Sequence, residues 1–512
     1  MTFFWGAVGY ILAGFAPGYL VVRVFRMERM LPPIAGPFAL SLIVNCIIVE
    51  VAVFFGAYTT TAARSVGSVI VSLSVLAFLS DRRLAFGSIV DRAHSVWLLL
   101  SSAAKHVGGR RLQILLLLSC IPALIVVLQT LHLLASSFGS ILVGYDPVAQ
   151  WNLWAVDWAA DRLPNRIYHY PQLVPILWSI PYVLMGNSAI EFFSSSFKFV
   201  FWLLTFETLV FVSMRSRDPV LLLGLPMTFI LVRWGIGGTS VQDSIDVPVA
   251  FFSLLSVATI LLPAPGRRQR QAIALALVLA SGAAMTKQVG LYMIGAIPLL
   301  CLCWTYQDHK QFAPVLRATP SLAWKASLAV MLCAPIYIYA ILTIRNGTNY
   351  SEFGFLFDGV YENRGRVSRA IEAMQVAYAW LGLGKTAGVL IAFLVFAAAN
   401  IAVVREPRYR WILLAINIPF SCLWAIYFSY DRRNLALTMP LWALTSTVGA
   451  RILLEPYLKL GPWPLAGRDS PERPASRTMR EGFAGRYGPA AIIVALGFAL
   501  VVAASNYFTE GR

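Results

Sequence analysis

The feature that most constrains this chain is a succession of apolar runs separated by short polar segments. Hydrophobic residues make up 58% of the 512 positions and charged residues only 13%. A soluble domain carries about 25% charged residues, and a run of about 20 apolar residues is the length that crosses a bilayer as a helix. The sequence therefore predicts an all-α polytopic membrane protein and excludes a soluble globular or disordered chain.

About fourteen segments are apolar enough over a sufficient length to be predicted as transmembrane helices. They lie at 3–22, 37–57, 66–80, 113–134, 190–213, 219–235, 247–263, 271–285, 289–304, 326–344, 386–403, 411–428, 435–450 and 489–506.

The distribution of Lys and Arg predicts the orientation. With the N-terminus outside and the sides alternating, every inner segment is basic, including 81–112, 305–325 and 451–488, as the positive-inside rule requires. This accounts for the net charge of +17 without nucleic acid as a partner. Segment 451–488 is predicted as a loose linker. Segment 174–186 contains two prolines and is predicted as a partly inserted helix that begins and ends on the outer face.

The large outer loop 135–189 holds the first functional candidates. Asp146 precedes Pro147 at the start of a predicted helix, where it is either a helix cap or a functional carboxylate. Along that helix Trp151, Trp154 and Trp158 share one face. They predict a helix anchored in the membrane interface, with contact to a sugar as the alternative. The same loop contributes Asp157, His169 and Tyr170 as residues that could shape a substrate site.

A second outer segment, 236–246, brings Asp243 and Asp246 to the beginning of a predicted span. Two carboxylates three residues apart share a face on one helical turn. They predict a cation site or a shared proton, with a solvated helix cap as the equally weighted alternative.

Three of the basic residues on the predicted outer side are candidates for a functional role. Lys287 lies alone at an outer turn, and Arg432 and Arg433 follow Asp431 at another. Lys287 is either a snorkelling cation or a phosphate ligand. The two arginines need a partner, and either a phosphate or Asp431 could provide it.

Together these outer charges suit one kind of chemistry. A carboxylate can deprotonate a hydroxyl acceptor, and cations can hold the phosphate of a lipid-linked donor and stabilise it as it leaves. The chain has no HExxH or CxxC pattern, no Walker A loop and no clear dinucleotide fingerprint.

Four segments, taken in order, resemble the polytopic GT-C glycosyltransferases that use polyprenyl-phosphate sugars. The resemblance is clearest to the bacterial protein-mannosyltransferase and aminoarabinose-transferase branch, family 39 and its relatives. The matching segments are Gly144-Tyr145-Asp146 with His169 to Leu173 and Gly186-Asn187-Ser188, Asp246 to Phe252, Ala284 to Gly290, and Tyr430 to Arg433 leading to Pro440.

The resemblance implies a division of the chain and of its residues' roles. It implies a GT-C-like core at 113–305 with a periplasmic pair of interfacial helices in loop 135–189. Extra helices and a basic loop precede it at 1–112. C-terminal helices follow at 306–450 with outer loop 345–385, then the linker 451–488 and a last helix and tail at 489–512.

By the same resemblance Asp146 is the general base, Lys287, Arg432 and Arg433 bind the donor phosphate, and Asp243 and Asp246 shape the donor or metal site. Many members have two adjacent acidic residues where Pro147 follows Asp146 here. The resemblance therefore leaves two alternatives. The site either works without a metal or holds a divalent cation such as Mg²⁺ or Mn²⁺ through Asp146 and Asp246.

The expected function is an inverting glycosyltransferase of the bacterial inner membrane with its site facing the periplasm. Its expected partners are a polyprenyl-phosphate-linked sugar donor, membrane lipids, and a glycolipid, glycan or protein acceptor. The first alternative is a multi-span transporter or flippase of envelope glycolipids, and the second is a non-catalytic assembly protein.

Overall fold

The chain folds into an assembly of helices, and the described residues contain no strand. The computed structural model describes residues 1–80, 110–137, 142, 146–164, 170–216, 218–236, 245–261, 267–345, 387–425 and 432–458. A helix occupies each predicted transmembrane segment up to residue 450, and segment 489–506 lies outside the described residues. Segment 345–385, which is predicted to be an outer loop, lies almost wholly outside them as well.

The N-terminal part consists of α1 (Thr2–Gly14), α2 (Ala16–Val24), α3 (Ala35–Phe54), α4 (Thr60–Ser80), α6 (Arg110–Ser137), η1 (Pro147–Trp151), α7 (Asn152–Ala159), α8 (Leu173–Met185) and α9 (Phe192–Ser195). The middle part consists of α10 (Phe197–Ser216), η2 (Pro219–Leu223), α11 (Gly224–Ile236), α12 (Asp246–Leu261), α13 (Arg267–Thr286), η4 (Gln288–Gly290), α14 (Leu291–His309) and α15 (Phe312–Arg345). The C-terminal part consists of α18 (Ala387–Ala402), η6 (Val403–Arg405), α19 (Pro407–Ile412), η7 (Leu413–Asn417), α20 (Ile418–Leu423), η9 (Arg432–Leu437) and α21 (Met439–Leu458).

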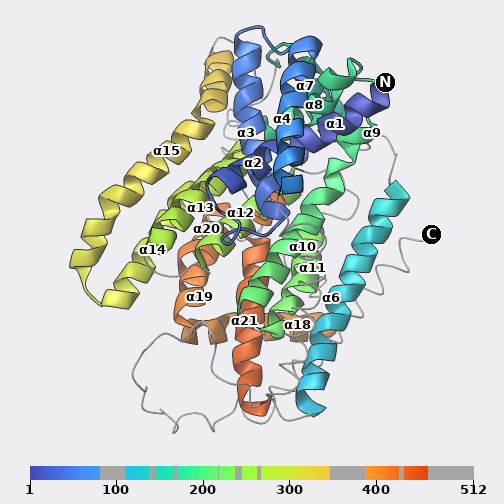
Figure 1. Ribbon diagram of the computed structural model, residues 1–512. Coiled ribbons are helices and arrows are strands. Elements are labelled where there is room, and N and C mark those ends of the chain that lie inside the picture. The colour runs from blue at the N-terminus through green and yellow to red at the C-terminus, as the bar shows by residue number, and fades with distance from the viewer. Residues whose placement is uncertain are drawn as a thin grey trace, which may run out of the picture.

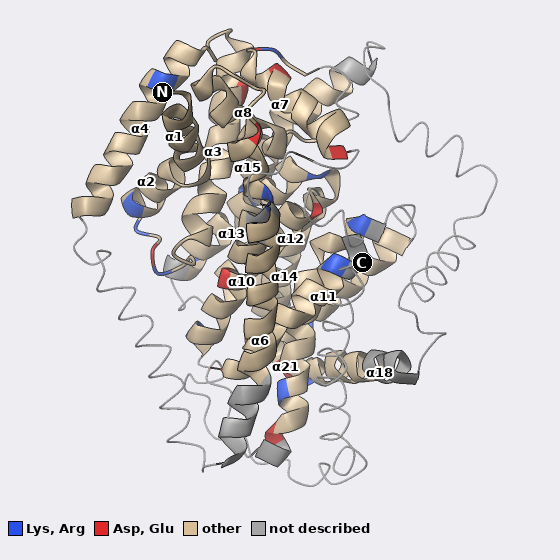
Figure 2. Cartoon of the chain, turned by 90° about the vertical axis from the view of Figure 1, so that its right-hand side faces the viewer, with Lys and Arg blue, Asp and Glu red and all other residues tan. Residues whose placement is uncertain are grey.

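Six helical segments of the described chain are long and apolar enough to cross a membrane: Thr2–Val24, Ala35–Phe54, Thr60–Ser80, Phe192–Ser216, Gln288–His309 and Phe312–Leu342. Large apolar side chains on α4 remain exposed, including Leu73, Leu76 and Leu79. Figure 2 shows how few Lys, Arg, Asp and Glu residues interrupt the helices. This architecture is that of an all-α membrane protein.

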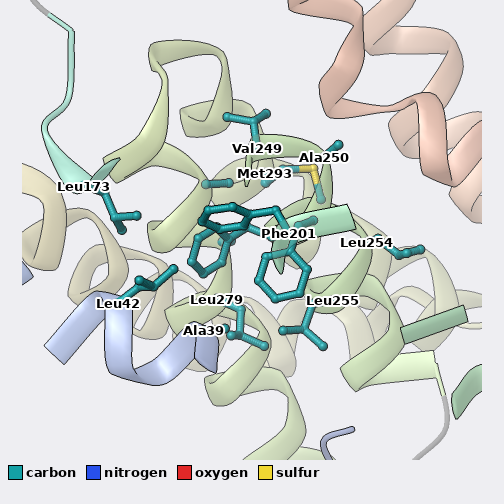
Figure 3. Close-up of a cluster of buried hydrophobic side chains, with 14 of the residues drawn as sticks. Ala39, Leu42, Leu173, Phe201, Val249, Ala250, Leu254, Leu255, Leu279 and Met293 are labelled. Atoms are coloured by element: carbon teal, nitrogen blue, oxygen red, sulfur yellow. The ribbon is translucent and has the colours of Figure 1, made fainter. Parts of the chain in front are cut away.

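Helices α8 and α12 form the centre of the packing. Every residue of both helices is buried, as expected for helices that are apolar on all sides. Figure 3 shows Phe201 of α10 amid side chains from five other helices. The labelled neighbours are Ala39 and Leu42 of α3, Leu173 of α8, Val249, Ala250, Leu254 and Leu255 of α12, Leu279 of α13 and Met293 of α14.

The structure corrects the predicted role of the tryptophan stripe as a membrane anchor. In Figure 1, α7 and α8 lie at the same end of the molecule as the N-terminus. The residues Trp151, Trp154 and Trp158 are only 3%, 4% and 0% exposed, however, and Trp158 donates a hydrogen bond to Gln172 at 3.2 Å. The tryptophan stripe and α8 are therefore packed inside the protein, and the prediction of an interfacial anchor was wrong.

Two predicted inner segments are partly helical. Only residues 310–311 separate α14 from α15, so most of 305–325 is helix. Helix α21 continues to Leu458, eight residues into the predicted linker, because Arg451 is buried and forms an ion pair with Asp218. Burial raises the pKa of Asp218, and the charge of Arg451 partly offsets this effect.

Close helix crossings depend on glycine at particular positions. A Cβ atom on Gly18 of α2 would lie 1.9 Å from the carbonyl oxygen of Pro37 in α3, whereas one on Gly295 of α14 would meet no atom within 4 Å. We expect Gly18→Ala to lower the free energy of unfolding by about 1–3 kcal/mol through overpacking. We expect Gly295→Ala to raise it by roughly 0.5–1 kcal/mol through a better helix propensity.

Thermal unfolding in detergent, followed by reaction of the buried cysteines with a thiol-specific dye, measures both variants. Equal midpoints for the two variants would contradict the close approach of α2 and α3.

Candidate functional site

Four of the predicted charged residues line one cavity. Its volume is about 90 Å³, and its lining consists of Asp146, Gln150, Trp151, Tyr170, Ile245, Asp246, Lys287 and Arg433. The charged members come from η9, from the starts of η1 and α12, and from the turn after α13. Segments separated by hundreds of residues thus meet at one polar site.

The deeper of two ion pairs joins Lys287 to Asp246. The ammonium nitrogen Nζ of Lys287 donates to Oδ1 of Asp246 at 2.6 Å, and the two side chains are 6% and 2% exposed. A buried charge requires such a partner because transfer of an isolated ion out of water is costly. Lys287 is therefore no snorkelling cation at the surface.

The backbone around Lys287 is held in place by its neighbours. Lys287 has an extended backbone between α13 and η4, and its N–H donates to the Ala283 carbonyl at 3.1 Å. The N–H of Gly290 donates to the Lys287 carbonyl at 2.9 Å. A Cβ atom at Gly290 would lie 2.2 Å from the backbone of Ala283, so only glycine allows this turn to pack on the end of α13.

The shallower ion pair joins Arg433 to Asp146. Nη1 of Arg433 donates to Oδ2 of Asp146 at 2.7 Å, and the side chains are 34% and 32% exposed. Asp146 precedes η1 but makes no side-chain capping hydrogen bond. The capping alternative for Asp146 is therefore wrong, and its carboxylate is directed at Arg433.

A π-helical turn explains how Trp151 reaches the cavity. In η1 the N–H of Asn152 donates to the Pro147 carbonyl, five residues back, and such wider turns occur frequently at functional sites. On an ideal α-helix Trp151 would lie on a different face from Asp146 and therefore away from the cavity. The i, i+4 spacing of Asp146 and Gln150 was the one signal in the sequence that could have identified Gln150.

Hydrogen bonds from outside the cavity hold the segment that carries Asp146. Glu191 accepts from the N–H of Leu142 at 2.9 Å and from Nδ2 of Asn152 at 3.1 Å. Oδ1 of Asn152 accepts in turn from the Tyr182 hydroxyl at 2.8 Å. Residues on both sides of Asp146 are thereby fixed to α8 and to the start of α9. Sequence reasoning did not identify Glu191.

The remaining predicted residues are placed as follows. Tyr170 lines the cavity, with its ring edge-to-face against Trp151 at a centroid distance of 5.2 Å. Asp157 lies outside the lining and pairs with the exposed Arg162 at 3.1 Å. Burial raises the pKa of Asp157, and the charge of Arg162 partly offsets this effect. Arg432 is the first residue of η9. Asp243, His169 and Asp431 lie outside the described residues.

The two possible metal ligands, Asp146 and Asp246, each have a cationic side chain as partner. Within the described part of the chain, no three His, Cys, Asp or Glu residues cluster in a way that could hold a metal ion. Lys287 and Arg433 thus balance the charges of the two carboxylates.

Comparison with known proteins gives no relative. No family model, no curated protein and no solved structure matches this chain significantly.

The contrast in burial between the two ion pairs generates a stability prediction. Removing one partner of a buried pair costs about 3–5 kcal/mol because the other charge is left uncompensated, whereas replacing both partners by apolar residues is often neutral. We expect Lys287→Met to cost this much and Asp246→Leu/Lys287→Met to recover most of it. Arg433→Met, in the shallower pair, should cost about 0–1 kcal/mol.

Unfolding of the purified protein in a denaturing detergent titration measures these differences. A double variant as unstable as Lys287→Met, or an equal loss for Arg433→Met, would contradict the assignment of a deep and a shallow pair.

Proposed function

We propose that this protein is a membrane-embedded glycosyltransferase of the GT-C type. It transfers a sugar, with inversion, from a polyprenyl-phosphate donor to a hydroxyl acceptor. The observation that supports this most is the meeting of Asp146, Asp246, Lys287 and Arg433 in one cavity. The proposal includes about fourteen spans, a GT-C-like core at 113–305 and a location in the bacterial inner membrane with the cavity on the periplasmic side.

Asp146 is the proposed general base. Its carboxylate takes the proton of the acceptor hydroxyl while that oxygen attacks the anomeric carbon of the donor sugar from the side opposite the phosphate. The bond between the anomeric carbon and the phosphate oxygen breaks, and its electron pair stays on the phosphate. The products are the glycosylated acceptor, a protonated Asp146 and polyprenyl phosphate.

Lys287 and Arg433 are the proposed ligands of the leaving phosphate. The donor is a phosphodiester with one negative charge, and the departing polyprenyl phosphate gains a second charge as the bond breaks. Preorganised cations beside a developing charge stabilise the transition state more than the bound substrate. Lys287 is well suited because Asp246 and the glycine turn fix it before the donor arrives.

Replacement of the base provides the activity prediction. We expect Asp146→Asn to lower the transfer rate by about 10²–10⁴-fold, the usual contribution of a general base. The protein is reconstituted in vesicles with a panel of undecaprenyl-phosphate sugars and a membrane extract as the acceptor source. Mass spectrometry then follows donor loss and release of undecaprenyl phosphate.

Glu28→Gln is the matched control, since Glu28 also forms a partly exposed ion pair with an arginine, Arg23, in a predicted inner loop. An unchanged transfer rate for Asp146→Asn would contradict the role of Asp146 as the general base. Movement of intact donor across the vesicle membrane without a covalent product would favour the transporter or flippase instead.

A further inference from the structure

The shallow ion pair has a consequence for the order of events at the site. In the structure Arg433 donates a hydrogen bond to Asp146. The proposed reaction, however, needs Arg433 to bind the donor phosphate and Asp146 to accept the proton of the acceptor hydroxyl. The guanidinium occupies Oδ2 of Asp146, an oxygen that the acceptor hydroxyl would have to approach, and it is itself turned away from the donor. The ion pair must therefore open before transfer can begin.

We propose that the donor's phosphate opens this pair by taking Arg433 from Asp146, so that the base becomes active only after the donor has bound. The acceptor then binds second. This inference rests on the proposed glycosyltransferase function and adds to it a means of preventing chemistry in the absence of donor.

The difference in burial decides which of the two pairs exchanges its partner. Lys287 and Asp246 are 6% and 2% exposed, whereas Arg433 and Asp146 are 34% and 32% exposed. Partly exposed pairs hold each other weakly because water competes for both groups, while separation of a buried pair leaves an uncompensated charge. An incoming phosphate thus recruits Arg433 without breaking the deeper pair.

The chemistry of the arginine side chain and its position also favour the exchange. A guanidinium has five N–H donors in a planar fork that matches phosphate oxygens. Arg433 lies in the short 3₁₀ segment η9, where hydrogen-bond geometry is poorer than in an α-helix. Lys287, in contrast, has its backbone tied to α13 and η4. Arg433 is therefore the cation that moves and Lys287 the one that stays.

Competition between a carboxylate and a phosphate for one arginine makes an unusual prediction. Removal of the Asp146 charge should tighten phosphate binding, because the carboxylate of Asp146 then no longer competes with the phosphate for Arg433. We expect Asp146→Asn to bind undecaprenyl phosphate roughly fivefold more tightly than the unaltered protein. Arg433→Gln should bind it more weakly, and Glu28→Gln should bind it equally well.

A double-mutant cycle separates exchange from simple repulsion. If Asp146 acts through Arg433, Asp146→Asn tightens binding less in the Arg433→Gln background than in the unaltered protein. The probes are undecaprenyl phosphate in nanodiscs, measured by titration calorimetry, and inorganic phosphate as a second arm. Thermal unfolding of each variant verifies that it is folded.

Several outcomes overturn the inference and can be told apart. Unchanged or weaker binding by Asp146→Asn, or equal tightening in both backgrounds, overturns the exchange and leaves the glycosyltransferase proposal standing. An affinity for inorganic phosphate equal to that for undecaprenyl phosphate overturns the claim that a lipid-linked donor opens the pair. Absence of undecaprenyl phosphate binding by the unaltered protein overturns both proposals.

Discussion

A charged side chain inside an apolar protein is stable only beside a partner of opposite charge, and the Lys287–Asp246 pair satisfies this requirement in the lining of the cavity. The pair joins the beginning of α12 to the end of α13, two helices that lie in the middle of the bundle in Figure 1. Because α12 is buried along its whole length, Asp246 has a fixed position. Lys287 is positioned by it, and the cavity takes its shape from both.

Much of the fold could be predicted because membrane helices have a strong sequence signal. Runs of apolar residues placed helices correctly up to residue 450. Packing between helices has no comparable signal. The tryptophan stripe of α7 has the same pattern whether it faces lipid or protein, and only the structure shows that Trp158 is buried and bonded to Gln172. The extension of α21 depends on Arg451, whose partner Asp218 is 233 residues away.

The charged residues of the site were predictable because an apolar chain has few of them, and those outside the basic loops stand out. Their pairing was not predictable. Asp431 lies outside the described residues, and the partner of Arg433 that the structure describes, Asp146, is 287 residues away in the sequence. Asp246 was grouped with Asp243, yet its carboxylate bonds to Lys287. The π-helical turn that brings Trp151 to the cavity changes the period that sequence reasoning assumes.

The central claim is that the cavity between the two ion pairs binds the phosphate of a polyprenyl-phosphate substrate. Electron cryomicroscopy of the protein in nanodiscs containing undecaprenyl phosphate tests it most directly. We expect density for the phosphate within hydrogen-bonding distance of Lys287 Nζ and the Arg433 guanidinium, with Asp146 separated from Arg433 and the Lys287–Asp246 pair intact. Lipid phosphate bound elsewhere, with the Arg433–Asp146 pair unchanged, would contradict the account.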